Sequence, residues 1–151
     1  QSKITYLEGY LWDLDDAQVA IKKATKVAKE NNKIVAFSVS DVFCIERFRD
    51  SFLSLINEEA DIIFANEEEI KSLLGTSDLD ESINIIKDKN KIFAITLGEN
   101  GAMIINNEEI IKIEPQKIDN LVANIWRIFT YFKQDYKMQS REIGAEKRGR
   151  I

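Results

Sequence analysis

The chain has 151 residues, of which 44% are apolar, and a formal net charge of −5, so it is long enough for one domain with a real core. The negative charge argues against a general nucleic-acid binder, because affinity for phosphate backbones comes largely from lysine and arginine. No apolar run approaches the roughly 18 residues of a membrane span, and the absence of histidine excludes Ser-His-Asp catalysis, Cys-His catalysis and imidazole-bound zinc.

The cysteine content and the first residues set the expected compartment. Cys44 is the single cysteine, which excludes an internal disulfide and any Cys-pair metal site. The opening QSKITYLEGYLWD has no signal-peptide h-region and no starting Met. We therefore expect a cytoplasmic protein and a chain that is a fragment.

The first half of the chain predicts alternating strands and helices. KITYLEGYLW is interpreted as a strand that runs to Trp12, and KIVAFSVS and DIIFA as buried strands. Helices are expected between them, because apolar residues recur at helical spacing. On the first helix these residues are Ala17, Ala20, Ile21, Ala24, Val27 and Ala28, and on the second they are Ile45, Phe48, Phe52, Leu55 and Ile56.

The second half continues this pattern and then changes. EEEIKSLLG predicts a short helix closed by Gly75, LDESINIIKDK a further helix opened by Asp78 or Asp80, and KIFAITLG a buried strand. AMIINNEEIIKIEP predicts a hairpin that turns at Asn106-Asn107. The alternation predicts an α/β fold with a mostly parallel sheet, right-handed crossovers and a C-terminal antiparallel hairpin.

Three clusters of polar residues follow strands, where α/β sheets bind ligands. Ser40 and Asp41 follow one strand, and either a capped helix start or a ligand contact explains them equally well. Asn66 and Glu69 follow the next strand. Read alone, they are best explained as the cap of a helix. They also share one face of that helix, however, and a carboxylate there could hold Mg²⁺ or its waters.

The third cluster is TLGENGA, with Thr96, Gly98 and Gly101. Glycines between two strands usually serve turn geometry, but they also let backbone N–H groups approach a nucleotide. Cys44 is expected to be a small buried apolar residue, because no base stands beside it.

The order of these motifs resembles the PfkB, or ribokinase-like, family of sugar and nucleoside kinases. Asn66–Glu69 matches its N-x-x-E motif, and Thr96, Gly98 and Gly101 match T-x-G-x-x-G. EGYLWD and SDVFCIERFR look like the adenosine-kinase-like branch. The resemblance implies a Rossmann-type sheet and ATP-dependent phosphorylation of a sugar or nucleoside hydroxyl. It places Asn66 and Glu69 near the Mg²⁺–phosphate region, with Glu69 as the metal-side residue, and the Thr96–Gly101 loop along the nucleotide.

The resemblance ends after KID of EPQKIDN. The family's G-A-G-D motif, which supplies an anion hole and the catalytic base, is expected there, but no glycine lies between Gly101 and Gly144 and no aspartate between Asp119 and Asp135. We therefore interpret residues 1–119 as the C-terminal core portion of a kinase domain, without a catalytic base and without the N-terminal sugar site. Residues 120–151 are interpreted as an atypical aromatic and basic tail, read out of frame or from a rearranged gene.

Two functions follow from this reading. One is a truncated, inactive PfkB-type kinase domain whose parent binds ATP, Mg²⁺ and a sugar or nucleoside. The other is a non-catalytic α/β module that binds a nucleotide or a protein, with an interaction helix formed by Ile125, Ile128, Phe129, Phe132 and Tyr136. We expect neither nucleic acid nor membrane as a partner. Exposed edges of an incomplete sheet would favour association, with a homodimer as one outcome.

Overall fold

The computed structural model describes residues 2–115, so the expectations for residues 120–151 lie outside the described part. The described strands are β1 Ile4–Glu8, β2 Ile34–Ser38, β3 Ile62–Asn66, β4 Ile92–Thr96, β5 Ala102–Asn106 and β6 Glu109–Ile113. The helices are α1 Asp15–Glu30, α2 Val42–Glu58, α3 Glu67–Leu74 and α4 Leu79–Ile86, with two 3₁₀ turns, η1 Gly9–Asp13 and η2 Gly98–Asn100.

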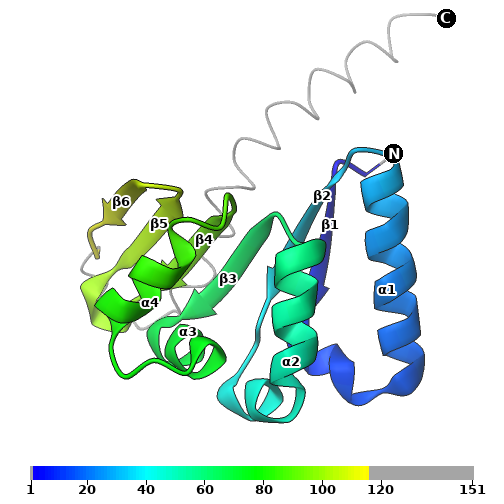
Figure 1. Cartoon of the computed structure of the whole chain (residues 1–151), viewed down its shortest axis with the longest axis horizontal. Coiled ribbons are helices and arrows are strands. Elements are labelled where there is room, and N and C mark those ends of the chain that lie inside the picture. Colours follow the sequence, from blue (N-terminus) through cyan, green and yellow to red (C-terminus); the bar gives the residue numbers. More distant parts are fainter. Residues whose placement is uncertain (1, 116–151) are drawn as a thin grey trace, which may run out of the picture. The chain divides into compact units, whose positions relative to one another are not determined.

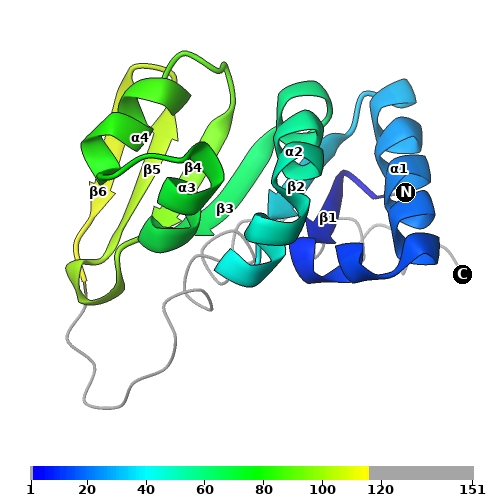
Figure 2. The ribbon, with the colours of Figure 1, turned by 60° about the horizontal axis from the view of Figure 1, so that its bottom comes forward.

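The strands form one sheet in the order of the chain, β1-β2-β3-β4-β5-β6. β1 to β4 are parallel, and β5 and β6 are antiparallel to their neighbours. The four α-helices lie on the same face of this sheet (Figures 1 and 2). A right-handed crossover that always steps in one direction places every helix on that face. The predicted mixed sheet and C-terminal hairpin are thus confirmed.

The core lies between the sheet and the helices. Alternate strand residues such as Phe37, Ile63 and Ile95 are fully buried there. Phe52 of α2 packs edge-on against Phe37, with ring centroids 5.1 Å apart. Within residues 2–115, no helix combines the length and the apolar character that crossing a bilayer would require.

The first strand is shorter than predicted. β1 ends at Glu8, and GYLWD forms the 3₁₀ turn η1 instead of continuing the strand to Trp12. A Cβ on Gly9 would lie 2.6 Å from the Val39 carbonyl oxygen, so the chain turns where only glycine fits. Trp12 then packs edge-on against Phe52, at a centroid distance of 5.7 Å. Of the residues that suggested a strand here, Gly9 and Trp12 are buried by this turn, whereas Tyr10 and Leu11 remain exposed.

Two smaller details also differ from expectation. Ala20 and Val27 of α1 are exposed, and Thr25 is buried on the face of α1 that packs against the sheet.

The hairpin turns one residue later than predicted, because Asn106 still pairs with Glu109. The turn residues are therefore Asn107 and Glu108, and Asn107 adopts φ 54°, a left-handed conformation that Asn tolerates in such turns.

Candidate functional site

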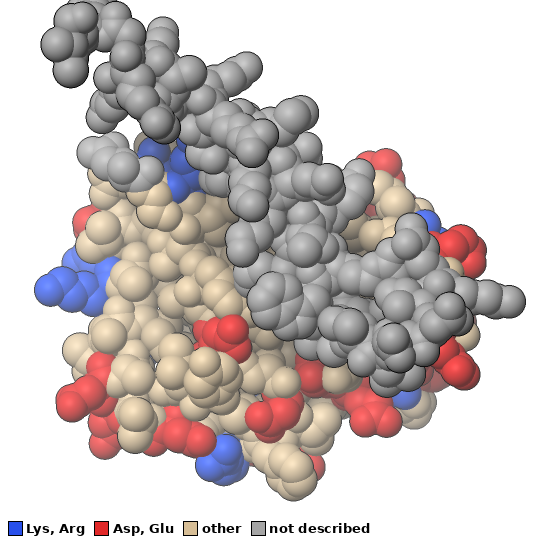
Figure 3. Space-filling model, turned by 180° about the vertical axis from the view of Figure 1, so that it is seen from behind, with Lys and Arg blue, Asp and Glu red and all other residues tan. Residues whose placement is uncertain are grey.

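The polar residues singled out from the sequence gather at one edge of the sheet. β1 to β4 are parallel, so their carboxyl ends, Glu8, Ser38, Asn66 and Thr96, point the same way. Asn66 and Thr96 are direct cross-strand partners. Seen from behind, acidic side chains predominate along the lower edge, toward which β1 to β3 run (Figure 3). This edge is therefore the place to look for a ligand.

Asn66 and Glu69 form a reciprocal cap at the start of α3. The Asn66 side-chain oxygen accepts from the Glu69 backbone N–H at 2.8 Å. In return, Glu69 Oε2 accepts from the Asn66 backbone N–H at 2.8 Å, and Oε1 accepts from Asn66 Nδ2 at 2.6 Å. This is a capping box, which satisfies two backbone donors that the helix end would leave without partners. The cap that the sequence suggested is present.

The Glu69 carboxylate is more than a cap, because it is buried in an acidic neighbourhood. Only 8% of the residue is exposed. Burial raises its pKa above the ordinary 4.5; the Asn66 backbone hydrogen bond opposes this shift, and the charges of Asp41 and Glu68 add to it. A cation at this position would relieve both the desolvation and the repulsion. Each oxygen also keeps acceptor capacity beyond its one hydrogen bond.

Asp41 lies at the neighbouring strand end and caps α2. Its Oδ1 accepts from the Cys44 backbone N–H at 2.8 Å, and this bond is the largest cause of its lowered pKa. The Cys44 thiol donates to Oδ2 of Asp41 at 3.4 Å, and burial, with Asp41 as the next cause, raises its pKa. Cys44 therefore stays a protonated, buried thiol, which agrees with the expectation that it is no nucleophile.

Two exposed aromatic side chains flank Ser40. The Ser40 hydroxyl accepts from the backbone N–H of Tyr10 at 3.2 Å, which ties η1 to the end of β2. Tyr10 is 52% exposed, and Phe43, in the first turn of α2, is 75% exposed. Sequence reasoning did not single out either residue. The signal was weak, because an aromatic residue in an apolar stretch is expected to be buried.

The loop after β4 uses its two glycines differently. Gly98 has φ 57°, and nothing lies within 4 Å of an added Cβ, so its surroundings are open. Gly101 has φ 88°, and an added Cβ would clash with the Ile113 carbonyl oxygen. The Gly101 N–H donates to the Gly98 carbonyl at 3.3 Å. At Gly101 the loop therefore passes too close to Ile113 for a side chain to fit. At Gly98 the loop has open space, and this is the side from which a ligand could approach.

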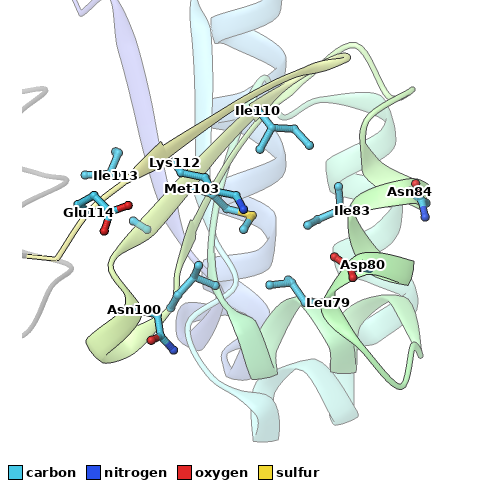
Figure 4. A pocket seen from close by; sticks show the side chains of 12 residues that line it. Leu79, Asp80, Ile83, Asn84, Asn100, Met103, Ile110, Lys112, Ile113 and Glu114 are labelled. Carbon is cyan, nitrogen blue, oxygen red and sulfur yellow. The ribbon is translucent and has the colours of Figure 1, made fainter.

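A groove of about 700 Å³ lies between α4 and the β5–β6 hairpin, on the helix side of the sheet (Figure 4). Apolar side chains such as Ile83, Met103 and Ile110 line it, and Lys112 points into it (Figure 4). Asn100 of the loop after β4 is at one end. The groove includes neither Asp41 nor Glu69, so it is separate from the acidic strand ends.

The predicted ligand residues are thus placed near one another, while their roles stay predictions. Within residues 2–115, no group of three or more His, Cys, Asp or Glu side chains converges in the way that would hold a metal by protein ligands alone. Asp41 and Glu69 can supply hard oxygen ligands, which Mg²⁺ accepts together with waters and substrate phosphates. The donor set therefore fits a magnesium ion carried by a nucleotide better than a protein cage.

Residues 1–122 match the model described as pfkB family carbohydrate kinase. No curated protein matched the chain.

Solved structures resemble both the fold and the sequence. An adenosine kinase from Sinorhizobium meliloti is 35% identical with a TM-score of 0.77, over 82% of this chain and 38% of that chain. A probable sugar kinase from Rhizobium etli CFN 42 is 38% identical with a TM-score of 0.76, over 80% of this chain and 37% of that chain. The chain thus spans less than two fifths of these relatives' length.

A more distant structure shows the fold alone. A fructokinase double mutant from Vibrio cholerae O395, with fructose, ADP and potassium ion bound, has a TM-score of 0.67 at 17% identity, over 79% of this chain and 40% of that chain.

Proposed function

Because the chain belongs to the pfkB family of carbohydrate kinases, we propose that its parent protein transfers a phosphoryl group from ATP to a hydroxyl group of a nucleoside or sugar. The family and the ribokinase-like α/β fold expected from the sequence are confirmed. The activity, the ligands and the residue roles are the proposal. In it, residues 2–115 provide the side of the site that holds magnesium and the nucleotide phosphates.

The observation that carries this proposal is the buried Glu69 carboxylate beside Asp41, at the carboxyl edge of the sheet. Phosphoryl transfer depends on positioning and on neutralising phosphate charge. Glu69 would hold Mg²⁺ or its waters, and Asp41 would add negative potential from the next strand. The loop from Thr96 to Gly101 would line the nucleotide, with its open side at Gly98. ATP supplies the phosphoryl group when bound.

Tyr10 and Phe43 favour a nucleoside over a simple sugar. Exposed aromatic side chains at a ligand-binding edge offer flat apolar surface for a planar base. A sugar presents hydroxyl groups, which need hydrogen-bonding partners. The two relatives, one an adenosine kinase and one a probable sugar kinase, have similar identity to this chain, so identity alone does not separate the substrates.

We further propose that this chain by itself has little or no kinase activity. No residues between 102 and 143 match the family's G-A-G-D motif, since that stretch contains no glycine. Without such a motif the chain lacks the aspartate that, in the family, would take the proton from the attacking hydroxyl. Incubation with ATP, Mg²⁺ and adenosine or ribose should give no phosphorylated product. Turnover close to that of intact kinases would refute this part.

Nucleotide binding is tested by thermal unfolding of the full chain with Mg-ATP. Saturation at a hundred times Kd should stabilise the protein by about 2.7 kcal/mol. Glu69→Gln should reduce the Mg-dependent part of this shift, and the matched control is Glu68→Gln, an exposed residue in the same turn of α3. If Mg-ATP produces no shift in any variant, the alternative, a module that binds a protein partner, becomes the better explanation.

A further inference from the structure

The last strand of the sheet has a free edge. Among the described residues β6 pairs only with β5, in a regular antiparallel ladder from Ala102–Ile113 to Asn106–Glu109. Its other edge presents backbone N–H and C=O groups without a neighbouring strand in residues 2–115. Such an edge is a template for pairing with another chain.

The side chains of β6 make this edge apolar on both faces. All five residues are exposed; Ile110 is 42% exposed, Ile111 47% and Ile113 42%. Ile110 pairs with buried Ile105 and lies on the helix side, whereas Ile111 pairs with Ile104 on the opposite face. Natural edge strands are usually protected by charge, proline or a bulge. Here the charged residues within the strand are Glu109 and Lys112, the strand contains no proline, and the ladder has no irregularity.

The groove beside β6 leaves space for an added strand. Ile110 and Lys112 border the 700 Å³ groove on the helix side, and α4 forms its far wall (Figure 4). A strand paired with β6 would place alternate side chains over this groove and the others over the opposite face. Strand addition gains affinity from main-chain hydrogen bonds and specificity from such spaces.

We propose that β6 pairs antiparallel with β6 of a second copy of this chain, so that one sheet continues through both copies. With a twofold axis at Ile111, this residue meets its own counterpart, and Ile110 lies opposite Lys112 of the second copy. Like charges are kept apart, whereas in-register parallel pairing would place lysine against lysine.

A second copy fits this edge better than an unrelated extended peptide. The contact is isologous: β6 of each copy pairs with β6 of the other, so both edges are used and the assembly closes as a dimer. Closure removes the risk of open-ended growth that an apolar edge strand otherwise carries. The groove shares Leu97 and Asn100 with the loop proposed to line the nucleotide, but it includes neither Asp41 nor Glu69. The paired residues themselves belong to β6, so pairing of the two copies does not require the proposed function.

The test is the mass of the full chain in solution, measured by light scattering and sedimentation over a range of concentrations. The wild type should be a dimer that dissociates on dilution. Ile111→Lys, which places two lysines on the twofold axis, should raise the dimer Kd at least about tenfold. The matched control is Val19→Lys on α1, where the valine is 66% exposed and the helix packs on β1 and β2 at the other end of the strand order from β6; it should leave Kd unchanged. Ile111→Thr, a milder change, covers the case in which the lysine variant does not fold.

Hydrogen exchange identifies the surface. The alternate amides of β6 that point away from β5 should exchange more slowly as the concentration rises and the dimer forms. A wild type that stays monomeric at every concentration overturns the proposal, as does a dimer that survives both substitutions at residue 111. Protection of β6 that is equal in monomer and dimer would mean that the edge is covered within one copy. Assemblies that grow beyond a dimer would contradict closure.

Discussion

Asn66 and Glu69 hold each other through three hydrogen bonds, two of which involve a backbone N–H. The same carboxylate is buried and lies under the influence of Asp41. This pair of residues therefore begins α3, and it also holds the poorly solvated carboxylate of Glu69 at the ligand-binding edge. Capping and function do not compete here, because the cap fixes the orientation of Glu69.

Removing the cap should cost stability. Asn66→Ala deletes the acceptor for the Glu69 N–H and the Nδ2 donor to its carboxylate, so we expect a loss of about 2 kcal/mol, at the upper end for caps. The comparison is Asp78→Ala, which removes the single capping bond of α4 to Glu81 and should lose about 1 kcal/mol. Urea unfolding measures both. Equal losses would show that the hydrogen bond from Asn66 Nδ2 to Glu69 Oε1 adds nothing.

The pKa of Glu69 should respond more to Asp41 than to its neighbour in α3. Titration of the Glu69 carboxyl by NMR should give a midpoint above 4.5. Asp41→Asn should lower this midpoint more than Glu68→Gln, because Asp41 is the larger of the two raising charges. An unchanged midpoint in Asp41→Asn would show that the two strand ends are not electrostatically coupled.

This shift has a definite sign for stability. A carboxyl whose pKa is raised in the folded state binds its proton more tightly there than in the unfolded chain. Its contribution is fully present below the unfolded pKa and is lost as pH rises through the folded pKa. Relative to Glu69→Gln, the wild type should therefore lose stability as pH rises above about 4.5. Urea unfolding at several pH values measures the difference, and a difference of the opposite sign would contradict the raised pKa.

The two glycines after β4 should differ in their tolerance of a methyl group. Gly98→Ala has open space, so it should cost only the left-handed backbone conformation, about 1 kcal/mol. Gly101→Ala forces a Cβ against the Ile113 carbonyl and should cost about 4 kcal/mol or prevent folding. Unfolding by urea separates the two, and similar losses would mean that the chain after β6 moves aside freely.

Tyr10 and Phe43 should contribute to nucleoside binding without supporting the core. Both are largely exposed, so Tyr10→Ala and Phe43→Ala should change the unfolding free energy by less than about 1 kcal/mol. If the chain binds adenosine, each substitution should weaken binding severalfold and leave ribose binding unchanged, as titration calorimetry would show. The control is Ile85→Ala on α4, similarly exposed but remote. Equal affinity of the double variant and the wild type for adenosine would argue for a sugar substrate.

The sequence predicted those features that depend on local pattern. Buried strands such as β2 and β3 are continuous apolar runs, and Asn66 and Asp78 are visible as helix starts. The sequence pattern did not predict the 3₁₀ turn η1. This turn depends on the close approach of Gly9 to the Val39 carbonyl, a contact between residues far apart in the chain. Tyr10 and Phe43 were not predicted as site candidates for a similar reason, because the exposure of an aromatic ring depends on tertiary packing that the residue pattern does not show.

The strand order of the sheet matches the order of synthesis, since each strand pairs with the one made just before it. A nascent chain that emerges from the ribosome can add each strand–helix unit to a surface already formed, without waiting for a distant partner. Loop-closure entropy is then lost in small steps, which favours rapid folding for a sheet that is largely parallel. Within residues 2–115, the direction of growth also leaves the most recently made strand, β6, at one end of the sheet.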